Sequence, residues 1–78
     1  MRPRIEYRPV KLRTNEGPPH TDHWEAFYTD SAGEELYHET HPEYVELALF
    51  ELHQRLRQEG YHSEDLPKAH MLSPRYVG

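Results

Sequence analysis

The stretch from Thr40 to Tyr61, THPEYVELALFELHQRLRQEGY, has the pattern of one long helix and decides the fold class of this 78-residue chain. Thr40 followed by Glu43 matches the capping-box pattern T-x-x-E, which marks the start of many helices. Gly60 suits the left-handed position that follows the last turn in a Schellman ending. We therefore predict a helix over residues 40–59.

The predicted helix carries two separate apolar sets. With successive residues about 100° apart, one stripe forms the core face. Its members are Val45, Ala48, Leu49, Leu52 and Leu56. The second set, Tyr44, Leu47 and Phe50, lies on the far side among acids and cannot pack under the same sheet. Either the C-terminal tail covers this second set, or a second copy of the chain or another protein contacts it.

The segment 23–39, HWEAFYTDSAGEELYHE, is the clearest hairpin signal. Two aromatic-rich runs flank a turn in which Asp30 opens the loop and Gly33 takes a left-handed conformation. A slip of one residue would exchange the two faces of the hairpin. We expect one set to face the core and a second to stay partly exposed: Trp24, Ala26 and Leu36 inward, Phe27 and Tyr37 partly outward.

The first 14 residues form a basic strand with a change of phase at its middle. Ile5 and Tyr7 share one face, whereas Val10 and Leu12 share the other. Pro9 sits at the change, and because it cannot donate to a ladder it indicates a bulge or an edge strand. Residues 15–22, NEGPPHTD, have the composition of a loop.

These elements predict an α+β fold in the order βββα, with a three-stranded antiparallel sheet packed on one long helix. A chain of this length makes a single domain, 1–78, with a small core. Residues 60–78 contain two prolines and no clear periodicity, so we expect an irregular tail. Its apolar residues are too many for a disordered segment, and the tail either wraps the body or becomes ordered on a partner.

Composition restricts the compartment and the chemistry. The chain has no cysteine, which removes disulfides and thiolate chemistry and fits a reducing environment. It shows neither the apolar core of a signal peptide nor the roughly 20 apolar residues of a membrane span. We expect a soluble, cytoplasmic protein.

The net charge of −5 conceals a segregation of charge along the chain. Residues 1–14 carry five basic side chains and one acid, for a net +4, and residues 66–78 carry a net +2. Residues 15–65 carry thirteen acids and two arginines, for a net −11. This asymmetry indicates a basic arm for an anion, an acidic body for a cationic partner, or pairing between the two within the fold.

No pattern in the sequence supports catalysis. The seven histidines include two pairs with i, i+3 spacing, His20 with His23 and His38 with His41, which could ligate zinc if the hairpin joined them. No established zinc motif accompanies them, and their charging at low pH is a simpler role. The serines lack a nucleophile context, and no phosphate-binding glycine loop is present. We expect no enzyme, no cofactor and no metal.

The remaining hypothesis is a small acidic protein-binding module, an inhibitor or antitoxin-like protein of the phage or mobile-element type. Its partner would be a basic, nucleic-acid-handling protein, and a homodimer is an additional alternative. The expected contact residues are Tyr44, Leu47, Phe50, Glu43, Glu46, Glu51, Phe27, Tyr37, Glu35 and Glu39. The alternative function is nucleic-acid binding through the basic first strand, with Arg4, Tyr7, Arg8, Lys11 and Arg13.

Overall fold

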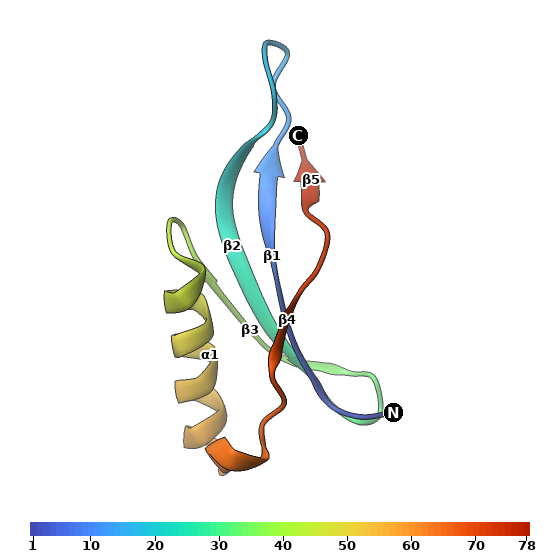
Figure 1. The fold of residues 1–78 in the computed structure, drawn as a ribbon, viewed down its shortest axis with the longest axis vertical. Helices are drawn as coiled ribbons and strands as arrows, with labels where there is room; N and C mark the ends of the chain where they lie inside the picture. Colours follow the sequence, from blue (N-terminus) through green and yellow to red (C-terminus); the bar gives the residue numbers. More distant parts are fainter.

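The computed structural model describes all 78 residues and is an α+β fold, with one helix against one face of a mixed five-stranded sheet (Figure 1). The elements, in order, are β1 (Arg4–Leu12), β2 (His20–Thr29), β3 (Glu35–His41), α1 (Val45–Gln58), a 3-10 turn (Ser63–Asp65), β4 (Ala69–Met71) and β5 (Arg75–Val77). The α+β class is as predicted.

The sheet is larger than the sequence predicts. Strands β1, β2 and β3 form the expected antiparallel set, in the order β3-β2-β1. The C-terminal segment then adds β4 and β5, which both run parallel to β1 along its other edge. The expectation of an irregular tail is therefore wrong for these six residues, because two short extended runs, one on each side of Pro74, complete the edge of β1.

Strand β1 is the centre of the sheet and not an edge, although Pro9 lies within it. The carbonyl of Tyr7 accepts a hydrogen bond from the backbone N–H of Leu72 at 2.8 Å. Since backbone groups of alternate residues point to the same side, the nitrogen of Pro9 also faces the tail. Pro9 lies between the part of β1 that pairs with β4 and the part that pairs with β5, so its missing N–H breaks no hydrogen bond of either ladder. The predicted bulge at Pro9 is absent from β1: the register shifts between Val10 and Lys11, and the extra residue there is Asp22 of β2.

The faces of β3 are opposite to those expected. Thr29 pairs with Glu35 and Tyr28 with Tyr37, so Leu36 is an extra residue at a bulge. The bulge exchanges the two faces of the following residues, which places Tyr37 on the helix side of the sheet. Leu36, expected in the core, is 40% exposed. The turn itself is as predicted, with Gly33 at φ +86° and two backbone N–H groups donating to Asp30 Oδ1.

The helix begins five residues later than predicted. Thr40 and His41 belong to β3, where they pair with Glu25 and Trp24, so the expected capping box does not form. Instead, Nδ1 of His41 accepts hydrogen bonds from the backbone N–H groups of Glu43 and Tyr44, at 3.1 and 3.0 Å.

The end of the helix is the predicted Schellman ending. Gly60 has φ +99°, its N–H donates to the carbonyl of Arg57, and the N–H of Tyr61 donates to the carbonyl of Leu56. This reversal brings the ring of Tyr61 to 5.3 Å from that of Tyr28, measured between centroids. The aromatic pair closes the core at the end of the helix.

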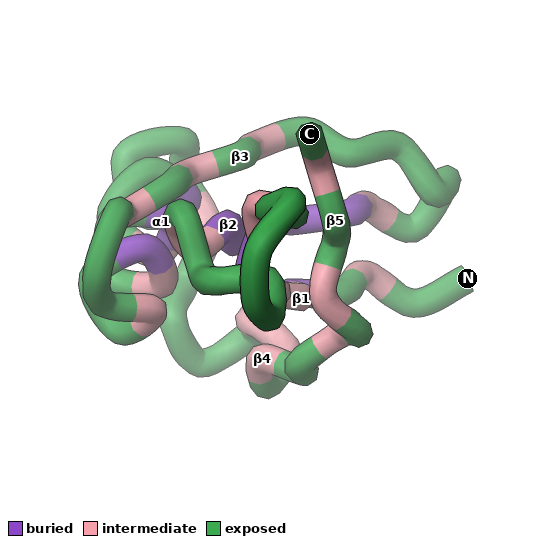
Figure 2. The backbone as a smooth tube through the Cα atoms, turned by 90° about the horizontal axis from the view of Figure 1, so that it is seen from above, coloured by how far each residue is buried: buried purple, intermediate pink, exposed green.

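The core lies between α1 and the lower half of the sheet in Figure 1. It consists of Ile5, Ala26, Tyr28, Ala48, Leu52 and Leu56. Val45 and Leu49, the other members of the predicted stripe, are half-buried, and Trp24 is half-buried on β2. Figure 2 shows the buried positions confined to the middle of the sheet and the inner side of the helix.

The sheet extends well beyond the helix. Strand β2 begins at His20, inside the segment expected to be a loop, because Leu12 and Lys11 pair with His20 and Thr21. The result is a long hairpin that projects past α1 in a molecule of 45 × 24 × 16 Å (Figure 1). The face of the sheet opposite α1 carries no helix. The single helix is not long and apolar enough to cross a membrane.

Two leucines on the same helix test the core assignment. Leu52 is fully buried and Leu47 is 43% exposed. We expect Leu52→Ala to lower the free energy of unfolding by about 2 to 5 kcal/mol, because it leaves a cavity in a small core. Leu47→Ala should change it by less than about 0.5 kcal/mol. Urea unfolding of both variants measures the difference, and equal losses would contradict the placement of the core.

Candidate functional site

The far side of α1 presents an uncovered apolar patch, which we call the helix patch: Tyr44, Leu47 and Phe50. Phe50 is 58% exposed and Leu47 43%, and they lie one turn apart. The tail does not cover them, since it leaves the helix at Tyr61 and crosses to β1. Three exposed acids border the patch: Glu43, Glu46 and Glu51. Of the alternatives that the sequence leaves open, cover by the C-terminal tail is therefore not the one adopted.

A groove runs beside the helix patch, between α1 and the segment that leads to β4. It has a volume of about 420 Å³, and Phe50 forms part of its wall. The helix contributes Leu49, Phe50 and His53, and the other wall is Ser63, Leu66, Pro67, Lys68 and Ala69. The groove extends the apolar surface of the patch toward the open edge of β4. The sequence did not reveal it, because its second wall comes from the tail.

The hairpin residues expected in the same surface do not join it. Phe27 is buried on the opposite face of the sheet, where the guanidinium of Arg8 lies 5.2 Å from its ring centroid. Tyr37 is half-buried on the helix side under Arg55, and Glu39 forms an ion pair with Arg55 at 3.6 Å. Glu35 is exposed at the turn. The helix part of the predicted contact surface is thus contiguous, and the hairpin part is dispersed.

The basic residues of β1 are also dispersed. Tyr7 packs against the core on the helix side. Arg4 forms an ion pair with Glu6 at 3.2 Å, and Arg8 forms one with Glu25. Arg13, past the end of the strand, stacks on Tyr76 at 5.1 Å. Lys11 lies on the projecting hairpin. Some of the basic side chains of β1 are therefore already paired with acids of the same chain.

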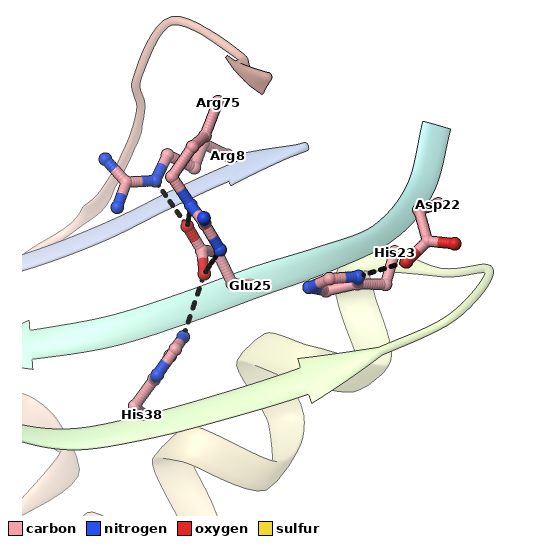
Figure 3. Close-up of polar contacts among 6 residues, drawn as sticks. All are labelled: Arg8, Asp22, His23, Glu25, His38 and Arg75. Carbon is pink, nitrogen blue, oxygen red and sulfur yellow. Dashed lines mark hydrogen bonds and ion pairs between the residues drawn. The ribbon is translucent and has the colours of Figure 1, made fainter. Parts of the chain in front are cut away.

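The helix-free face of the sheet holds a second cluster, centred on the buried carboxylate of Glu25, whose side chain is 2% exposed. Oε1 accepts from Nε of Arg8 and from Nε of Arg75 at 3.3 Å. Oε2 lies 3.4 Å from Nη2 of Arg75 and 3.0 Å from Nε2 of His38. Figure 3 shows the two guanidiniums on one side of Glu25 and His38 on the other. We call these four residues the Glu25 cluster.

The cluster fixes the charge state of its carboxyl group. Burial by itself raises the pKa of Glu25, but hydrogen bonds and charge from Arg8 and Arg75 outweigh it and lower the pKa from 4.5 to about 2. The group is an ionised acceptor at neutral pH, so the facing nitrogen of His38 carries the proton and donates. A buried carboxylate with this many donors is fully satisfied.

No feature of the sequence indicates this cluster. Arg75 and Glu25 are 50 positions apart, and nothing in the composition of the tail indicates that it pairs with β1. The facing of Arg8 and Glu25 follows only from the register between β1 and β2. Glu25, one of the thirteen acids counted in residues 15–65, is buried.

The histidine pairs do not assemble a metal centre. No group of three or more histidine, aspartate or glutamate side chains stands close enough to hold a metal ion. His38 contacts Glu25 on the helix-free face, and His41 caps the turn before α1. His23 contacts its neighbour Asp22 at 2.8 Å.

Comparison of the chain with protein-family models, with curated proteins and with solved structures found no match. The function is therefore argued from the two surfaces described above, the helix patch with its groove and the Glu25 cluster.

The low pKa of Glu25 makes stability depend on pH in a defined direction. The folded state binds its proton less readily than the unfolded state, so stability is present above the unfolded value of 4.5 and is lost as pH falls toward about 2. The expected loss from this group is about 3 kcal/mol. Glu25→Gln should remove this part of the pH dependence and lower the free energy of unfolding at neutral pH.

Urea unfolding at a series of pH values measures both effects. Glu46→Gln is the matched control, because Glu46 is exposed and has no ion-pair partner. The control should keep the whole acid-dependent loss of the unaltered chain. If Glu25→Gln kept it too, the arginines would not stabilise the charged form of Glu25.

Proposed function

We propose that this protein is a small, acidic, non-catalytic protein-binding module whose helix patch engages a basic protein. The observation that carries the proposal is the exposure of Leu47 and Phe50, one turn apart on a helix whose opposite face already fills the core. An apolar patch that remains after the core is complete is typical of an interaction surface.

The composition of the surface suits a contact of this kind. Aromatic and aliphatic side chains at the centre of an interface supply most of the binding free energy, and Phe50 and Tyr44 are large enough to act as such anchors. The groove beside Phe50 can receive a side chain of the partner. The acids around the patch would attract a basic surface and orient it during the encounter.

The charge of the whole chain favours the same kind of partner. With a net charge of −5, the protein repels polyanions and attracts basic proteins, including those that handle nucleic acid. We therefore propose an inhibitor or antitoxin-like role, of the kind that phages and mobile elements use, in which the acidic helix occupies a basic groove. Nucleic-acid binding through β1 is less favoured, because the predicted residues do not form one surface: Arg4 is paired with Glu6, and Tyr7 packs against the core.

The test is the affinity for a partner captured from lysate and then purified. The double variant Leu47→Asp, Phe50→Asp should weaken binding by at least about 2 kcal/mol, roughly 30-fold, because it puts charge into the centre of the contact. Changing Glu43, Glu46 and Glu51 together to Gln should slow association and reduce its dependence on salt. Surface plasmon resonance measures both quantities.

Leu36→Asp is the matched control, since Leu36 is a comparably exposed leucine on another element. It should leave the affinity unchanged. Equal affinities of the double variant and the control would exclude the helix patch as the binding surface. Sedimentation of the free protein separates self-association from partner binding: a dimer that the double variant dissociates would assign the patch to a second copy of this chain.

A further inference from the structure

The Glu25 cluster has more positive charge than its own carboxylate neutralises. Two guanidiniums face one carboxylate, which leaves a net charge of +1 before any protonation of His38. The arginines also have unused donors. Arg8 uses only Nε on Glu25, and Arg75 uses Nε and Nη2, so both terminal nitrogens of Arg8 and Nη1 of Arg75 have no partner within the chain.

These donors are accessible to solvent. The side chain of Arg8 is 31% exposed and that of Arg75 is 45% exposed, on the face of the sheet that no helix covers. Glu25 lies beneath them, since its side chain is buried. A ligand would therefore meet the guanidiniums and not the carboxylate.

The guanidiniums are also held in place before any ligand arrives. Glu25 fixes both arginines, and the ring of Phe27 lies under Arg8 with its centroid 5.2 Å from the guanidinium carbon. His38 packs edge-on against the same ring, at 6.1 Å between centroids and an angle of 89°. Long side chains that are already ordered lose less entropy on binding, which favours a ligand that is recognised by them.

Glu25 is the only acid that forms an ion pair with Arg8 or Arg75. Glu6, two residues before Arg8, is paired with Arg4 at 3.2 Å. Asp22 is in contact with His23 at 2.8 Å. Neither acid forms an ion pair with Arg8 or Arg75, so one positive charge of the two arginines remains for an anion.

We propose that Arg8 and Arg75, held by Glu25 on the helix-free face of the sheet, bind the phosphate group of a small phosphate ester. Guanidinium groups recognise phosphate through charge-assisted and often bidentate hydrogen bonds, and two of them suit a doubly charged oxyanion. The site lies on the opposite side of the sheet from the helix patch and does not depend on the protein-binding proposal.

The source of the phosphate group is a small molecule and not a nucleic acid. The chain has a net charge of −5, so its acidic surfaces would repel a polyanion that extends beyond the two arginines. A single phosphate ester is small enough to avoid this repulsion. The site also has one pair of arginines, whereas a nucleic-acid strand is bound by a groove of many positive groups.

The test is a titration of the full chain, labelled with nitrogen-15, with inorganic phosphate at constant ionic strength. The titration is monitored by NMR. We expect saturable shifts confined to the Nε–H signals of Arg8 and Arg75 and the amides around Glu25. Arg75→Gln should weaken phosphate binding by at least about tenfold, the loss of one hydrogen bond to a charged group. Arg8→Gln, in the central strand, should do the same.

Arg57→Gln is the matched control, because Arg57 is exposed on the helix and lies outside the cluster. It should bind phosphate as the unaltered chain does. Shifts that chloride reproduces at the same ionic strength, or that persist in Arg75→Gln, would overturn the site. Tighter binding of a single-stranded oligonucleotide at the same signals would overturn the assignment to a small ester. The unaltered chain tests the location of the site even if one variant does not fold.

Discussion

The pairing of β1 on both of its edges is the constraint on which the rest of the structure depends. One edge meets β2 along nearly its whole length, and the other meets β4 and then β5. This arrangement buries Ile5 against the helix and Val10 on the other face. It also carries Arg75 to Glu25, so both the core and the polar cluster follow from the position of one strand.

The sequence predicts the local features well and the long-range ones poorly. The turn at Gly33, the Schellman ending at Gly60 and the core stripe of α1 depend on residues close together in the chain, and all three are present. The start of the helix was misplaced because a local capping pattern at Thr40 competes with a strand partner that only the sheet supplies. The bulge at Leu36 likewise depends on the register with β2, which the residues of β3 alone do not specify.

The same division applies to the two surfaces. The helix patch could be predicted because a helix of fixed period places Leu47 and Phe50 away from its core stripe whatever the helix packs on. The Glu25 cluster could not, because it joins side chains from β1, β2, β3 and β5. The charge pattern along the chain counts Glu25 as one of thirteen acids and Arg8 as one of five basic residues, without indicating that they pair. The fold pairs these two side chains. The basic first strand and the acidic body therefore neutralise each other in part, which is one of the alternatives that the charge pattern indicates.

The parallel pairings of β1 also determine when the sheet can be completed. Ile5 pairs with Ala69 and Leu12 with Val77, which are 64 and 65 positions apart in a chain of 78 residues. Contacts between such distant residues require the closure of a long loop and slow the folding of small domains. The second edge of β1 therefore stays unpaired during synthesis until residues 69–77 have been added. The hairpin and helix depend on contacts between nearby residues and can form before these pairings are made.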